Sequence, residues 1–176
     1  MEKMIAPAQD MGESITITER SQLLSITPEQ ARKIKSLRIE NQVIDAEAYF
    51  DFRDFFSLLK KLDALYFVKC QFVSFYSEIL RLVDSVPIIG IVECNLSESY
   101  VEDIIWPIKD WLPLHTLDLS SNRIGEEPEK FLVFLKNEIC GVVSVGSLIL
   151  ANNDISLNYQ FKISELMKCR GANVSF

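Results

Sequence analysis

An eleven-residue pattern recurs five times along this chain of 176 residues. Residues 114–124 read Leu-His-Thr-Leu-Asp-Leu-Ser-Ser-Asn-Arg-Ile, with apolar residues at positions one, four, six and eleven and asparagine at position nine. The windows that begin at 34, 62, 86 and 145 carry apolar residues at the same four positions. The five starts lie 28, 24, 28 and 31 residues apart. Spacing of this kind indicates one strand-containing unit repeated along the chain.

Amphipathic segments between the windows predict helices, because their apolar residues recur at helical spacing. Asp45, Ser74 and Ser99 each stand where a helix is expected to begin. Two further helices are expected over residues 126–137 and 158–168. The chain is therefore predicted to be an α/β protein with parallel strands on one side and helices on the other.

The two ends of the chain differ from the central units. Residues 14–18 alternate apolar and polar like a strand, and Thr27 with Pro28 reads as the start of a capped helix. We therefore divide the chain into an N-terminal segment with a capping strand and helix, residues 1–33, and a repeat domain, residues 34–176. A partial sixth unit is expected to open near residue 171.

These windows resemble the leucine-rich repeats of the ribonuclease-inhibitor type, over about residues 27–176. The resemblance implies a leucine-rich repeat solenoid of about five repeats plus a partial sixth, with strands on the concave side and helices on the convex side. It also implies that each position-nine side chain points inward and bonds to backbone groups of its own and adjacent units, a task that suits asparagine. The residues assigned to this structural ladder are Gln42, Cys70, Cys94, Asn122 and Asn153.

Charge and composition exclude several function classes. The formal net charge is −7, which argues against direct binding of nucleic acid or of an anionic membrane. The first twelve residues lack the apolar core of a secretory signal, so a soluble chain in the cytoplasm or nucleus is expected. The four cysteines form no C-x-x-C pair, which is typical of free thiols in a reducing compartment.

No residue pattern points to catalysis, a metal or a cofactor. Cys70 and Cys94 occupy position nine of neighbouring units and would lie close together, yet packing explains them better than a metal or redox pair. Cys140 and Cys169 have no partner pattern. His115 is the single histidine, and nothing places a thiol beside it as a Cys–His nucleophile requires. We therefore expect a non-enzymatic protein without catalytic residues, metal ligands or cofactors.

The outward face of the strands is the predicted interaction surface. Positions three, five and seven of each window alternate with the inward positions and must point away from the helices. Their central members are apolar and their outer members are polar, and a contiguous apolar patch is typical of a protein-binding surface. The residues assigned to binding a protein partner are Arg38, Glu40, Tyr66, Val68, Ile88, Val92, Asp118, Ser120 and Ile149.

Three alternatives stay open at this stage. The N-terminal segment or a second copy in a homodimer could cover this face. The resemblance also allows a regulator of a small GTPase, because some proteins of this type activate such enzymes and Arg123 could stabilise a transferring phosphate. Finally, the acidic runs 98–103 and 126–129 could bind basic proteins such as histones or ribosomal proteins, although carboxylates also favour helix starts.

Overall fold

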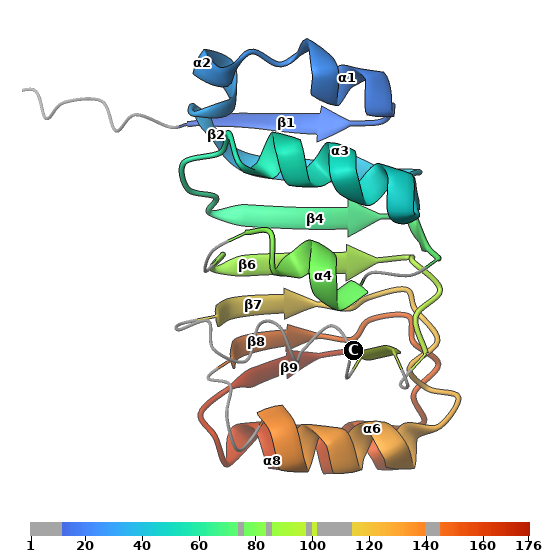
Figure 1. The fold of residues 1–176 in the computed structure, drawn as a ribbon. Coiled ribbons are helices and arrows are strands. Elements are labelled where there is room, and N and C mark those ends of the chain that lie inside the picture. The colour runs from blue at the N-terminus through green and yellow to red at the C-terminus, as the bar shows by residue number, and fades with distance from the viewer. Residues whose placement is uncertain (1–11, 74–75, 84–85, 98–99, 102–113, 140–144) are drawn as a thin grey trace, which may run out of the picture.

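The computed structural model describes residues 12–73, 76–83, 86–97, 100–101, 114–139 and 145–176. Seven parallel strands form one sheet in the order of the sequence (Figure 1). The predicted α/β class and parallel strands are therefore confirmed. The strands are β1 (Glu13–Ile17), β2 (Ile34–Glu40), β4 (Ala64–Val68), β6 (Ile88–Val92), β7 (Leu114–Asp118), β8 (Val145–Ile149) and β9 (Asn173–Ser175).

The register joins equivalent positions of successive windows. Leu65 of β4 pairs with Leu37 of β2 and with Ile89 of β6. Leu117 of β7 in turn pairs with Ile89 and with Leu148 of β8. Consecutive units thus place corresponding side chains on the same face of the sheet.

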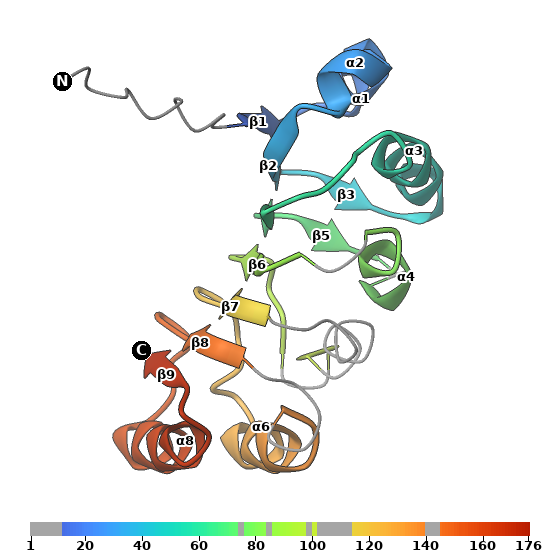
Figure 2. The ribbon, with the colours of Figure 1, turned by 90° about the vertical axis from the view of Figure 1, so that its left-hand side faces the viewer.

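The described helices all lie on one side of the sheet, as Figure 2 shows along the strands. The sheet curves, with the helices on its outer side. The six described α-helices are α1 (Arg20–Ser25), α2 (Pro28–Ala31), α3 (Ala46–Phe56), α4 (Tyr76–Leu80), α6 (Pro128–Phe134) and α8 (Leu157–Lys168). A π-helical turn, η1 (Leu135–Ile139), extends α6.

Helix starts follow the predicted capping residues where these are described. The side chain of Asp45 accepts a hydrogen bond from the Ala48 N–H at 2.9 Å and begins α3. Thr27 and Gln30 form the expected capping box of α2. The helix expected over 126–137 begins later, at Pro128, because proline fits the first helical turn. The start expected at Ser74 lies outside the described residues, and of the helix expected after Ser99 only residues 100–101 are described, both helical.

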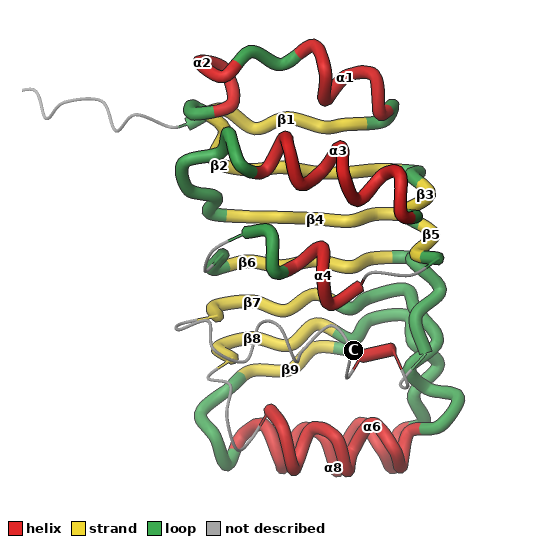
Figure 3. The backbone as a smooth tube through the Cα atoms, viewed as in Figure 1, coloured by secondary structure: helices red, strands yellow, loops and turns green. Residues whose placement is uncertain are grey.

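Two elements lie outside the predicted pattern. Helix α1 fills the connection between β1 and α2 and packs on α3, where Arg20 pairs with Asp51 at 2.6 Å. A second, two-stranded parallel sheet joins β3 (Val43–Ile44) and β5 (Gln71–Phe72), beyond the carboxyl ends of β2 and β4 (Figure 3).

A single apolar core fills the space between sheet and helices. The apolar residues at positions one, four, six and eleven of the five windows are all buried, none more than 9% exposed. Phe52 of α3 and Phe131 of α6 pack against them from the helix side and are fully buried. Burying a large apolar side chain contributes about 1.5–3 kcal/mol, so this repeated burial is what holds strand to helix in the units whose helices are described.

Candidate partner-binding face

The candidate site is the outward face of the sheet, on the side without described helices (Figure 2). Position five of each window crosses the middle of this face. Its members pair strand by strand, Arg38 with Tyr66, Tyr66 with Gly90, Gly90 with Asp118 and Asp118 with Ile149. Residues 111 positions apart in the chain therefore lie in one row across five strands.

An aromatic ring covers the centre of this row. A Cβ atom added to Gly90 would lie 2.2 Å from Cδ1 of Tyr66, so the ring of Tyr66 lies directly over that glycine. Burial and then the charge of Asp118 raise the pKa of the Tyr66 hydroxyl, while Arg38 acts in the opposite direction. The Tyr66 hydroxyl therefore stays protonated at neutral pH and can donate a hydrogen bond to a partner.

The apolar centre is smaller than the sequence predicted. Ile88 and Val92 are half-buried beside Tyr66 and present apolar surface. Val68, expected to be exposed, is only 5% exposed and offers almost no surface to a partner. It lies between Glu40 and Val92 on the neighbouring strands, and the curvature of the sheet brings outward side chains together. The apolar centre of the face therefore consists of Tyr66, Ile88 and Val92.

Polar and charged residues flank this centre. Arg38 and Glu40 form an ion pair with each other on β2. On the other flank, the Asp118 carboxylate accepts a hydrogen bond from the Ser120 N–H at 3.0 Å. Ile149 lies half-buried beyond Asp118 on β8. The described face thus has an apolar, aromatic middle and two polar margins.

The position-nine side chains lie beneath the carboxyl-terminal rim of this face and are all buried. Nδ2 of Asn122 donates to the carbonyl of Ile91 in the preceding unit at 2.7 Å and to that of Leu119 in its own unit at 2.8 Å. Its Oδ1 accepts from the N–H groups of Cys94 and Leu96, at 3.0 and 3.1 Å. One amide therefore joins two neighbouring turns.

The other position-nine residues make related contacts. Asn153 donates to the Leu119 carbonyl at 2.9 Å and accepts from the Ile124 N–H at 3.2 Å. Gln42 donates to the Thr18 carbonyl at 2.6 Å, which reaches the N-terminal strand. The thiols of Cys70 and Cys94 contact carbonyls of the preceding strand more weakly, at 3.4 and 3.5 Å.

A second regularity was not foreseen from the sequence. The residue before each position-nine side chain has a positive φ of 54–57° in all five units. Its N–H donates to a carbonyl at or just after the end of the next unit's strand in four of them, as Lys69 does to the Val92 carbonyl at 3.0 Å. Asparagine adopts a positive φ more readily than most other residues, so Asn41 and Asn152 are the two positions at which the sequence could have indicated this turn. The residues that share it are Asn41, Lys69, Glu93, Ser121 and Asn152.

The cysteines and the single histidine are the remaining candidates for a metal, redox or nucleophilic site. Contact with Cys70 and burial raise the pKa of the Cys94 thiol far above its usual range, so it stays protonated. The described residues contain no cluster of three or more side chains that could hold a metal ion. His115 and Cys169 are exposed, and Cys140 lies outside the described residues.

The charged groups named in the alternatives are paired within the chain. The guanidinium of Arg123 bonds to Glu126 at 2.5 Å. Glu127 pairs with Lys130, and Glu129 accepts a hydrogen bond from the Tyr159 hydroxyl at 2.6 Å. Of the acidic run at 98–103, the acidic residues lie outside the described part of the chain.

Comparison of the sequence with protein-family models and with curated proteins gives no match. Within the described ranges, no helix combines the length and apolar character needed to cross a membrane. Function is therefore inferred from the geometry and chemistry of the outward face.

Proposed function

We propose that this chain is a leucine-rich repeat solenoid of the ribonuclease-inhibitor type. Three observations support the proposal: the sequential order of the parallel strands, the helices on one side, and the position-nine side chains that join neighbouring turns. In a sheet built this way, all the described helices lie on one side, and none of them covers the outward face. Such a face offers a continuous surface to a partner.

The proposed function is non-enzymatic binding of a protein partner by this face. The observation that carries it is the cluster of Tyr66, Ile88 and Val92 between charged and polar margins, on the side that no described helix covers. Apolar centres with polar rims are the common anatomy of protein interfaces, and tyrosine is enriched in them.

The small size of this apolar centre limits the binding free energy that it can supply alone. A side chain that becomes fully buried contributes about 1.5–3 kcal/mol, and these three are already half-buried, so together they supply about 2–5 kcal/mol. Association costs an estimated ~4–15 kcal/mol. The polar margins at Arg38, Glu40, Asp118 and Ser120 therefore have to contribute hydrogen bonds and ion pairs to the same partner.

The test is a comparison of two charge-introducing double variants. Ile88→Glu with Val92→Glu changes the outward face, whereas Val133→Glu with Phe161→Glu makes the same kind of change on α6 and α8, where both side chains are more than half exposed. A captured protein is identified, purified and titrated against each variant by calorimetry. The proposal predicts loss of binding only for the first variant, and equal binding by both variants contradicts it.

The three alternatives have distinct experimental outcomes. Binding through acidic side chains would weaken steeply as salt rises, whereas apolar capture would not. Regulation of a GTPase would require the guanidinium of Arg123, so Arg123→Ala would abolish any stimulation of hydrolysis. A homodimer through this face would dissociate in the Ile88→Glu, Val92→Glu variant, which light scattering measures.

A further inference from the structure

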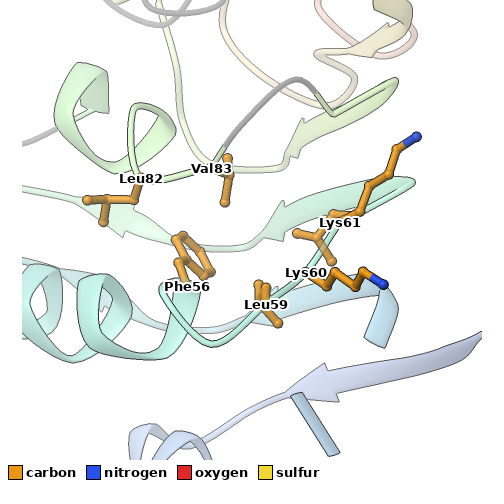
Figure 4. A pocket seen from close by; sticks show the side chains of 7 residues that line it. Phe56, Leu59, Lys60, Lys61, Leu82 and Val83 are labelled. Atoms are coloured by element: carbon orange, nitrogen blue, oxygen red, sulfur yellow. The ribbon is translucent and has the colours of Figure 1, made fainter. Parts of the chain in front are cut away.

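The cavity on the helix side of the sheet has no described side chains that converge on a ligand. It measures about 240 Å³ and lies beside the ends of α3 and α4, and the side chains of Lys60 and Lys61 at its edge extend away from it (Figure 4). Small-molecule sites combine apolar walls with a few polar groups that converge on the ligand. The outward face of the sheet is therefore the better candidate for specific recognition.

On that face, the ring of Tyr66 fills the place left open by Gly90 and extends towards Asp118. Gly90 pairs with Tyr66 on one side and with Asp118 on the other. A Cβ atom added to the glycine would lie 2.2 Å from Cδ1 of Tyr66, so the ring reaches from β4 across β6. Burial and then the charge of Asp118 raise the pKa of the Tyr66 hydroxyl, which agrees with a ring close to this carboxylate. An aromatic ring and a carboxylate therefore lie side by side at the centre of the face.

The Asp118 carboxylate has no cationic partner among the described residues. Its one described hydrogen bond comes from the Ser120 N–H, at 3.0 Å. Arg38 on β2 and Lys69 just after β4 are each paired with a glutamate instead. A cation is attracted both by the face of an aromatic ring and by a carboxylate. The ring and the carboxylate together therefore form a place for a positive charge that the described chain does not fill.

The apolar residues of β6 give this place a direction. Ile88 and Val92 stand two residues before and two residues after Gly90 on the same strand. Alternate residues of a strand face the same side and lie about 6.5 Å apart. An extended segment laid along β6 has the same spacing. Its alternate side chains can therefore meet Ile88, the ring and carboxylate beside Gly90, and Val92 in turn.

We propose that the outward face binds an extended segment of a partner protein with the pattern apolar–x–arginine–x–apolar. The arginine stacks on the ring of Tyr66 and pairs with Asp118, and the two apolar residues contact Ile88 and Val92. Arginine fits this place better than lysine, because a planar guanidinium can lie on a ring while its in-plane N–H groups reach a carboxylate beside it. This inference rests on the protein-binding function proposed above and adds the chemistry of the partner.

The test uses three capped pentapeptides, leucine–serine–X–serine–leucine, in which X is arginine, lysine or citrulline. Citrulline has nearly the shape of arginine but no charge. Titration of the ¹⁵N-labelled full chain by nuclear magnetic resonance should shift the amide signals of Gly90 and Asp118. The arginine peptide should bind at least about fivefold more tightly than the citrulline peptide, with lysine between them, because it gains a cation–π contact and an ion pair. Any other order, or no shift at Gly90 with millimolar arginine peptide, overturns the proposal.

Single variants assign the contacts of the arginine. Asp118→Asn keeps an acceptor for the Ser120 N–H and should weaken the arginine peptide about threefold, while the citrulline peptide is unaffected. Asp154→Asn, the matched removal of an exposed carboxylate from the next unit, should change neither. Tyr66→Leu should weaken the arginine peptide, whereas Tyr66→Phe keeps the ring and should not. Thermal melts identify a variant that does not fold, and equal losses in the two aspartate variants contradict the site.

The same variants separate this inference from the proposed function. A captured partner that loses binding to the Ile88→Glu, Val92→Glu variant but binds Asp118→Asn as tightly as the unchanged chain leaves the binding face in place and overturns the arginine site. A partner that binds all of these variants equally overturns both. Loss of binding in both the double variant and Asp118→Asn, with Asp154→Asn unchanged, is the result that the inference predicts.

Discussion

Replacing Asn122 is the most direct test of how neighbouring units are joined. Replacing Asn122 by alanine removes the acceptor of two backbone N–H groups, those of Cys94 and Leu96, and the donor to the carbonyls of Ile91 and Leu119. The asparagine side chain is only 7% exposed, so water cannot easily replace these bonds. The variant therefore leaves two buried backbone N–H groups of the preceding unit without their acceptor, whereas the Leu119 carbonyl keeps the hydrogen bond from Asn153.

The expected cost follows from counting the orphaned donors. A buried donor left unsatisfied costs about 1–3 kcal/mol, so the two N–H groups together cost about 2–6 kcal/mol. A domain of ordinary size has a free energy of unfolding of about 5–15 kcal/mol. Asn122→Ala should therefore remove a large part of the free energy of unfolding. Asn122→Cys, which introduces the residue that the preceding unit carries at position nine, should cost less.

Urea unfolding followed by circular dichroism measures both variants. Asn158→Ala is the matched control, because Asn158 is exposed on α8, and its free energy of unfolding should change by no more than about 0.5 kcal/mol. The slope of unfolding free energy with urea should stay constant. A loss below about 1 kcal/mol for Asn122→Ala would refute the interpretation that this amide joins neighbouring units.

Three further predictions concern the outward face and a helix start. Gly90→Val should push the Tyr66 ring aside and cost about 1–3 kcal/mol in urea unfolding, and Tyr66→Ala in the same chain should recover part of that loss. Asp118→Asn should lower the pKa of Tyr66 in an absorbance titration, because the Asp118 charge acts together with burial to raise it, and a higher pKa in the variant would contradict this. Because folding raises this pKa above the ordinary tyrosine value of 10.0, stability should fall as the pH rises from that value through the folded-state pKa. Asp45→Ala should cost about 1 kcal/mol by removing the hydrogen bond to the Ala48 N–H, and an unchanged melting curve would exclude Asp45 as a cap.

Much of the fold could be predicted because the pattern is redundant. Each window repeats the same apolar positions, so an error in one unit is corrected by the others, and residues such as Leu65 and Leu117 could be placed inward with their strands parallel. The capping residues Asp45 and Thr27 act locally, through backbone groups three residues away. Local contacts of this kind are readable from a single sequence.

Other features depend on neighbours that a sequence does not display. The burial of Val68 results from side chains on adjacent strands and from the curvature of the sheet, and neither is encoded in the alternation that placed Val68 outward. Lys69 and Glu93 adopt a positive φ although neither residue favours it, because the same turn recurs in every unit.

The account depends most directly on the side-by-side order of five strands. Methyl-labelled protein allows nuclear Overhauser effects to be measured between the inward residues that pair across the sheet, Leu37 with Leu65, Leu65 with Ile89, Ile89 with Leu117, and Leu117 with Leu148. We expect contacts between consecutive members of this series and the backbone pattern of parallel strands. Direct contacts between Leu37 and Leu117, or the close Hα–Hα pairs of antiparallel strands, would contradict both the stacked units and the proposed binding face.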